Sequence, residues 1–148
     1  MARRHPKIPL ATRTRIKKAR VARLATVDKK CRPHVVPICF VYFSGSFYTA
    51  IDRKPKQVSA ENLARVKHIR RCPEVALIFD EYSEDWRRLW YILVRGKASL
   101  IRRVTNREHA EAIRQLRAKY TQYAASMLAD EATVIRIRPE RIVSWGKL

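Results

Sequence analysis

Apolar residues recur along this chain with two spacings, one typical of β-strands and one typical of α-helices. Residues 33–43 are rich in β-branched and aromatic side chains, and they lead through a tight turn at 44–46 into a second apolar run over 46–52. A short apolar run at 24–28 precedes them. The three runs predict an antiparallel meander. Pro37 cannot donate a ladder hydrogen bond, so we expect its strand to lie at a sheet edge or to carry a bulge.

Later runs predict strands at residues 74–82, 89–101, 132–138 and 141–145. The first of these is apolar enough for the centre of a sheet. Gly96 lies inside the second, where a glycine commonly marks a bulge or a barrel corner. We therefore expect the sheet to curl as it does in a small barrel.

Helical spacing occurs in three segments. Residues 11–24 place small and apolar side chains on one side and cations on the rest. A second helix is expected to begin at Ser59, as its N-cap, and to end before Pro73. A third is expected to open with a capping box from Thr105 to Glu108. Its apolar stripe predicts core packing and consists of Ile113, Leu116, Tyr120, Tyr123 and Met127.

Together these elements predict one domain over residues 1–148 of the α+β class. We expect an antiparallel β-barrel of six to seven strands with two to three helices, and the family resemblance described below implies that it is a split β-barrel. Residues 1–20 form a basic N-terminal segment ahead of it.

The charge of the chain is strongly positive. The formal net charge is +20, from 33 Lys and Arg against 13 Asp and Glu, while 47% of the residues are hydrophobic, which argues against disorder. Such an excess attracts nucleic acid, anionic lipid or an anionic cofactor alike. Residues 1–23 carry nine of these cations and no acid. They form either a solvated basic face or a contact for a polyanion, which salt would weaken.

The sequence lacks several features that would indicate a membrane protein, a secreted protein or a metal site. No apolar run approaches the roughly 20 residues of a membrane span, and the N-terminus has no signal-peptide core, so we expect a cytoplasmic protein. Three cysteines without a CxxC pair favour reduced thiols over disulfides or zinc. The four histidines have no metal-ligand spacing, and we predict no metal site.

Three cations follow the predicted strand at 46–52. Arg53, Lys54 and Lys56 lie within four positions, with Pro55 stiffening the loop, and the predicted helix begins just beyond. The positive end of a helix dipole and these cations would point at one place, which predicts a phosphate site. The alternative is a solvated loop.

No catalytic side chain is predicted. The HExxH, GxSxG, P-loop and GxGxxG motifs are all absent, and His34 on its strand is typical of a structural histidine. An anion site beside an apolar strand, without a catalytic dyad, indicates an enzyme whose cofactor supplies the chemistry. Aromatic residues could form flat walls for a ring system, although core packing is their alternative role. They are Tyr48, Trp86, Trp90 and Trp145.

The succession of several segments resembles the FMN-binding split-barrel oxidoreductases, the flavin- and deazaflavin-dependent group that includes pyridoxamine 5′-phosphate oxidase. The segments cover about residues 20–101 and are RLATVD, RPHVVPICF, YTAID followed by RKPK, RRCPEVALIFD and DWRRLWYILVRGKASL. The pattern is most similar to the subgroup that uses coenzyme F-420, an 8-hydroxy-5-deazaflavin. One departure is Cys31, at a turn where these proteins commonly carry glycine.

The resemblance implies a homodimer with two cofactor sites at the subunit interface, and a small-molecule substrate. The cofactor ring would lie along the backbone of one strand, and Tyr48 and Thr49 would continue that wall. Arg53, Lys54 and Lys56 would bind the phosphate, and Trp86, Trp90 or Trp145 would cross from the partner. The strand residues are Pro33, His34, Val35, Val36, Pro37 and Ile38.

The function expected from this resemblance is hydride transfer between reduced coenzyme F-420 and an organic acceptor. The charge excess suits the phosphodiester and oligoglutamate tail of that cofactor. Three alternatives stay open: an FMN-dependent oxidase or reductase, a haem-handling or cofactor-storing split barrel without turnover, and a nucleic-acid-binding domain that uses the basic N-terminal segment.

Overall fold

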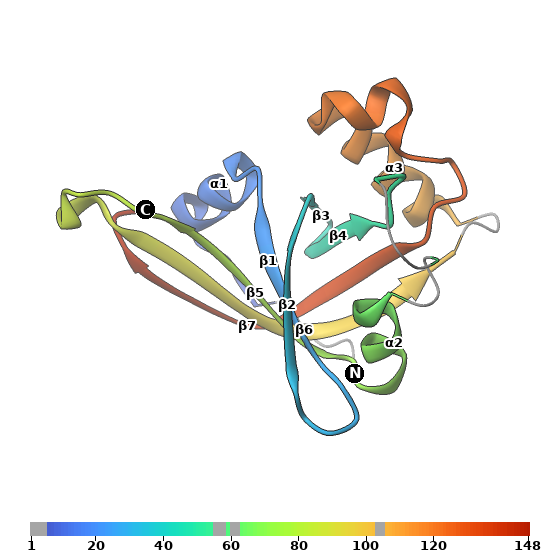
Figure 1. The fold of residues 1–148 in the computed structure, drawn as a ribbon. Helices are drawn as coiled ribbons and strands as arrows, with labels where there is room; N and C mark the ends of the chain where they lie inside the picture. Colours follow the sequence, from blue (N-terminus) through green and yellow to red (C-terminus); the bar gives the residue numbers. More distant parts are fainter. Residues whose placement is uncertain (1–5, 55–58, 60–62, 103–105) are drawn as a thin grey trace.

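One curled antiparallel sheet of seven strands organises the molecule (Figure 1). A computed structural model describes residues 6–54, 59, 63–102 and 106–148. The elements in chain order are α1 (Leu10–Lys18), β1 (Ala22–Val27), β2 (Pro33–Ile38), β3 (Val41–Phe43), β4 (Ser46–Ala50), α2 (Ala64–Arg71), β5 (Glu74–Glu81), the 3₁₀ turn η2 (Trp86–Arg88), β6 (Trp90–Ile101), α3 (Arg107–Lys119), the π-helical turn η3 (Tyr123–Met127) and β7 (Val134–Gly146).

The strand order is β2-β1-β5-β6-β7-β4-β3, with every pairing antiparallel. The half-barrel with helices around it confirms the predicted α+β split-barrel fold. The predicted central strand β5 lies between β1 and β6, and β2, which contains Pro37, is an edge strand. The predicted meander is only half right, because β4 pairs with β7 and β3 rather than with β2.

The predicted strand over 33–43 is broken, and residues after Ile38 cross from one edge of the sheet to the other. Phe40 lies at the break and is fully buried. Its backbone N–H donates to the Tyr120 hydroxyl at 2.9 Å, and its carbonyl accepts from the Lys119 ammonium at 3.0 Å. Side chains at the end of α3 thus form the hydrogen bonds with the Phe40 backbone that a neighbouring strand would otherwise form.

The two closing strands predicted at 132–138 and 141–145 are one strand, β7. Its register with β6 pairs Arg95 with Arg141 and Gly96 with Pro139, so Glu140 is the extra residue of a bulge. The bulge accommodates Pro139, which has no N–H for the ladder. It also confirms the bulge expected at Gly96.

The ends of the helices differ from the predicted ones. α1 ends at Lys18, whereas the predicted helix continued to residue 24. β1 begins at Ala22, two residues before the predicted start of this strand. The N-cap of α2 is Leu63 rather than Ser59; Leu63 packs against the core, so burial rather than capping sets this start. Asn106 caps α3 by accepting from the backbone of Glu108 and His109, and the predicted cap Thr105 lies outside the described residues.

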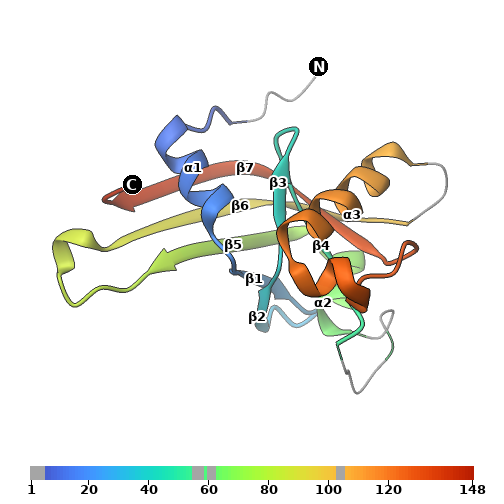
Figure 2. The ribbon, with the colours of Figure 1, turned by 90° about the horizontal axis from the view of Figure 1, so that it is seen from above.

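Two cores hold these elements together. One fills the inside of the half-barrel, where Leu24, Phe47 and Phe79 meet Ile16 of α1 and Val66 of α2. The other lies between the sheet and α3, which confirms that the apolar stripe of this helix packs inward. Seen from above, β3 lies between α1 and α3 (Figure 2).

The turn between β1 and β2 keeps a left-handed residue at the position of Cys31, whose φ is 60°. The Asp28 carboxylate accepts from the backbone of Lys30 and Arg32 and from the Arg32 side chain, which lowers its pKa to about 2. The turn therefore retains the backbone shape that a glycine would favour.

Among the described helices, none is long and apolar enough to cross a bilayer. All three cysteines are free. The described residues include no group of three or more His, Cys, Asp or Glu side chains able to hold a metal ion.

Candidate cofactor site

His34 lies where edge strand β2 meets helix α2. It is paired with Thr26 across the β1–β2 ladder, and the Thr26 hydroxyl is 2.9 Å from Nδ1 of His68 on α2. The two imidazole rings lie edge to face, with centroids 5.5 Å apart. Nδ1 of His34 is buried without a hydrogen-bond partner in the described part of the chain. An orphaned polar atom of this kind is uncommon and indicates a missing partner.

The surroundings of His34 favour an anion as that partner. Burial lowers the pKa of His34, and the nearby charges of His68 and Arg65 lower it further. Its protonated form is therefore disfavoured, and the two charges that act on it within the described residues, those of His68 and Arg65, are both positive. An anion bound here would be attracted by the charges of His68 and Arg65 and could accept a hydrogen bond from His34.

The end of β4 contributes a second set of charged groups. The Asp52 carboxylate accepts from the Tyr123 hydroxyl at 2.5 Å and from the Lys54 ammonium at 2.9 Å. Arg53 is anchored differently, since its guanidinium donates to the carbonyl of Ser126 at 3.2 Å. Lys54 and Arg53 are thus held in place by the turn after α3, although both remain exposed. Lys56 lies outside the described residues.

Arg65 connects the two sets. Burial lowers the pKa of its guanidinium, while the charges of Asp52 and Tyr123 oppose that effect. The same Arg65 charge acts on His34. We call His34, Arg53, Lys54, Arg65 and His68 the cationic cluster.

The backbone of β2 borders this cluster. Within the described residues β2 pairs with β1 alone, so its other edge carries main-chain N–H and C=O groups outside the ladder. The side chain of Val35 is 60% exposed on the outer face, whereas Ile38 points into the core. An extended ligand could meet main-chain donors and acceptors along this edge and place an anionic end at His34.

Other predicted site residues lie elsewhere. Tyr48 is buried beneath α3, where its hydroxyl donates to Glu108 at 2.6 Å, and Thr49 is also buried. β4 and β2 are far apart in the strand order, so the structure does not bring Tyr48 and Thr49 to the β2 edge. Trp90 is in the core and is covered by the Arg15 guanidinium, 5.2 Å from its ring centroid. These three residues fill the role of core packing.

Trp86 and Trp145 are on the arm formed by the ends of β5, β6 and β7 (Figure 1). Their side chains are 72% and 53% exposed. The Trp145 ring stacks on that of Tyr91 with centroids 5.8 Å apart. The outer face of this arm continues with Ile78, Leu93 and Val143, which are cross-strand neighbours. The outer face of the arm therefore exposes several large apolar side chains.

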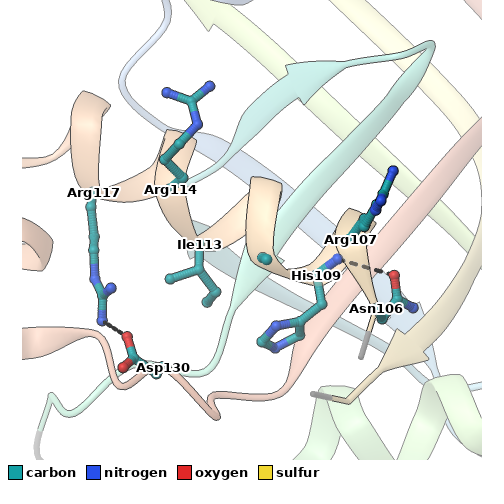
Figure 3. Close-up of a pocket in the computed structure, with 8 residues that line it drawn as sticks. Asn106, Arg107, His109, Ile113, Arg114, Arg117 and Asp130 are labelled. Carbon is teal, nitrogen blue, oxygen red and sulfur yellow. Dashed lines mark hydrogen bonds and ion pairs between the residues drawn. The ribbon is translucent and has the colours of Figure 1, made fainter. Parts of the chain in front are cut away.

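A cavity is found at a different place, along α3 (Figure 3). It has a volume of about 500 Å³ and is lined by Asn106, Arg107, His109, Ala110, Ile113, Arg114, Arg117 and Asp130. None of these residues was predicted for the site, and none belongs to the cationic cluster. The imidazole Nε2 of His109 lies 2.7 Å from the Ala132 carbonyl, so this histidine is structural.

Sequence reasoning missed Asp52, Arg65, His68 and Tyr123. Arg65 and His68 are three residues apart, a spacing that places both on one face of a helix. That signal was present, but the helix carries many cations, and only the packing of α2 on β1 selects these two.

A family model for pyridoxamine 5′-phosphate oxidase matches residues 8–146. No curated protein sequence matches the chain. Solved structures with the same fold include the haem storage protein HutZ of Vibrio cholerae, at 16% identity and a TM-score of 0.70, with 91% of each chain covered.

Two others are flavin or deazaflavin proteins by their descriptions. A FAD-binding protein of Mesorhizobium loti has 20% identity and a TM-score of 0.65, covering 91% of this chain and 90% of the other. A structure described as an F420 reductase has 15% identity and a TM-score of 0.65, covering 92% and 98%. At these identities the likeness concerns the fold alone.

Proposed function

Because the chain belongs to the pyridoxamine 5′-phosphate oxidase family, we propose that it is an oxidoreductase that transfers a hydride between reduced coenzyme F-420 and a small organic acceptor. The observation that carries this proposal is the unpartnered Nδ1 of His34 inside the cationic cluster, beside the open edge of β2. The cationic cluster could bind a phosphate, and the adjacent open edge of β2 offers main-chain hydrogen-bonding groups to a ring. A phosphorylated ring cofactor requires both.

The residues present fit such a cofactor. Arg53, Lys54 and Arg65, with Lys56 from the adjoining loop, would hold its phosphate, and His34 would donate to a phosphate oxygen. The main chain of residues 33–38 would contact the ring. When bound, the deazaflavin supplies the hydride chemistry.

The protein would contribute position and electrostatics. Arg65 is already partly desolvated, so its interaction with a phosphate is stronger than that of a fully hydrated arginine. Asp52 holds the Lys54 ammonium in one place and reduces the freedom that binding must remove. We name no side-chain acid or base, because the hydride step needs none.

A homodimer completes the proposed site. The apolar outer face of the arm would be covered by a second copy, and Trp86 or Trp145 of that copy would approach the β2 edge. The free cysteines suit a reducing compartment, and we propose that the dimer works in the cytoplasm. Light scattering at micromolar concentration should give twice the 17.4 kDa chain mass, and a stable monomer would refute the dimer.

The cofactor proposal is tested with R53Q/K54Q, which removes two cluster cations. The matched control is K29Q/K30Q, which removes two exposed cations from the β1–β2 turn. Titration of coenzyme F-420, followed by its fluorescence, should show affinity reduced at least about tenfold in the first variant, which corresponds to about 1.4 kcal/mol. The control should stay within about twofold once general attraction is screened by salt. Equal losses in both variants would remove the phosphate assignment.

Two alternative functions would use the same site. Titration with each candidate ligand distinguishes them from the F-420-dependent function. FMN offers a phosphate and a ring to the same groups, and preference for FMN over F-420 would make the protein an FMN-dependent oxidase or reductase. Haem storage is favoured by the free ring nitrogen of His34, because histidine nitrogens ligate haem iron. A haem-specific absorption band that H34A abolishes, with no affinity for F-420 or FMN, would establish that function instead.

A further inference from the structure

Three hollows follow one another around α3 and are joined by shared arginines. The cavity of about 500 Å³ shares Arg107 with a second hollow of about 400 Å³ beside the β3–β4 hairpin. It shares Arg114 with a third of about 400 Å³ between α3, β3 and α1. The three hollows are therefore neighbours around the helix. We call this set of hollows the α3 track.

The α3 track carries an excess of positive charge. Its lining contains seven Arg and Lys residues against two carboxylates, those of Glu108 and Asp130. Both carboxylates are already paired, with Arg136 at 3.1 Å and with Arg117 at 2.7 Å. Two further cations also have partners, since Arg114 pairs with Glu111 at 2.6 Å and the Lys119 ammonium donates to the Phe40 carbonyl at 3.0 Å. In the portion of the chain that the structure covers, Arg107, Arg138 and Lys17 form no ion pair with a carboxylate.

These cations are spaced along one direction. Arg107 and Arg114 are separated by about two turns, and Figure 3 shows both reaching out on one side of α3 while Ile113 and His109 point to the other. From Arg107 to Lys119 the helix rises about 18 Å, the length of about five stacked nucleotides. The track is thus suited to an extended anion rather than to a single phosphate.

Aromatic rings accompany the cations. Tyr42 lines the hollow beside α1, and its neighbour Phe43 lines the hollow on the other face of the hairpin. Both rings are half-buried, and Phe43 stacks on Tyr48 with centroids 4.2 Å apart, which fixes its orientation. A rigid aromatic platform beside phosphate-binding cations suits stacked bases, whereas an acidic peptide would use the cations alone.

We propose that the α3 track binds single-stranded nucleic acid, with cations on the phosphates and the hairpin aromatics on the bases. The track shares no residue with the cationic cluster, so this binding is independent of the cofactor. It accounts for much of a net charge of +20 that one bound cofactor leaves uncompensated.

The test measures binding of a fluorescent 20-nucleotide thymidine strand by anisotropy from about 50 to 200 mM salt. R107Q/R114Q removes two track cations, and R70Q/R71Q removes two exposed cations from α2 as the matched control. We expect the first variant to lose about tenfold or more in affinity and to flatten the salt slope by about 1.4. The control should lose much less, and F-420 affinity should be unchanged in both.

Three outcomes would overturn the proposal. Equal losses in the two variants would mean that net charge alone attracts the strand. An abasic strand that binds as tightly as the thymidine strand, or polyglutamate that competes as well as DNA, would remove the stacking role and make the track a general anion surface. Failure to bind at about 50 mM salt would exclude nucleic acid altogether.

Discussion

Gly96→Ala tests the bulge that lets β6 and β7 run together along their whole length. A Cβ added at Gly96 would lie 2.2 Å from the Arg138 carbonyl oxygen, 2.9 Å from its carbonyl carbon and 3.1 Å from Cα of Pro139. Ordinary contact begins at 3.4 Å, so the strands must separate by about 1 Å here. All three atoms are backbone, and no side-chain rotation can relieve the clash.

The cost can be estimated from this geometry. Overpacking of this kind costs about 1–3 kcal/mol. Separating the strands also weakens one or two ladder hydrogen bonds, at about 1 kcal/mol each. We therefore expect a loss of about 2–5 kcal/mol, a large share of the roughly 5–15 kcal/mol available to a domain.

Urea unfolding measures this loss. With an m-value of about 2 kcal/mol per M, the midpoint of Gly96→Ala should fall by about 1–2.5 M. Lys97→Ala is the control at the next position; its ion pairs with Glu74 and Glu140 are partly exposed, so it should cost less than about 1 kcal/mol. If Gly96→Ala unfolded within 1 kcal/mol of the parent, the close approach of β7 would not constrain the fold as argued.

Three other predictions follow from single residues. Tyr120→Phe removes the hydroxyl that bonds the buried Phe40 amide and should cost about 1–3 kcal/mol in urea unfolding; a neutral result would mean that the strand break does not depend on it. Cys31→Gly should raise stability by up to about 1 kcal/mol, because glycine adopts the φ of 60° without strain, and a loss would contradict this. His34 has a lowered pKa, so the unfolded chain binds more protons and stability should fall as pH drops through about 6.5. Sulfate at the site should raise the His34 pKa in an NMR titration, and an unchanged pKa would argue against an anion beside this ring.

The elements with strong local patterns were predictable. β5 and β6 lie within one residue of the segments expected for them, because each is a long run of apolar and β-branched residues with turn residues at its ends. The bulge at Gly96 was also predictable, because a glycine inside a strand often marks a bulge or a close approach of another backbone. In these cases local composition and tertiary packing favour the same structure.

The candidate site was predictable only in part. His34, Arg53 and Lys54 were predicted from the sequence and belong to the cationic cluster, whose other members, Arg65 and His68, come from α2. Tyr48 and Trp90 have the composition of ligand-facing aromatics, yet both serve the cores. A side chain's face depends on which strands lie beside it; the hairpin of β3 and β4 was predicted, but the pairing of β4 with β7 was not.

The sequence alone determined the fold class, the sign and size of the charge, and the presence of cations after β4, because these depend on composition and on short-range periodicity. The tertiary structure decided that residues 33–43 form two edge strands, that β7 passes through Pro139, and that His34 and Asp52 are each close enough to Arg65 to interact with it electrostatically. Each of these depends on contacts between distant residues, such as the Tyr120 hydroxyl on Phe40, 80 positions away. The free energy gained from such long-range contacts exceeds the intrinsic preference of a segment for helix or strand. The sequence of the segment itself does not show which distant residues will contact it.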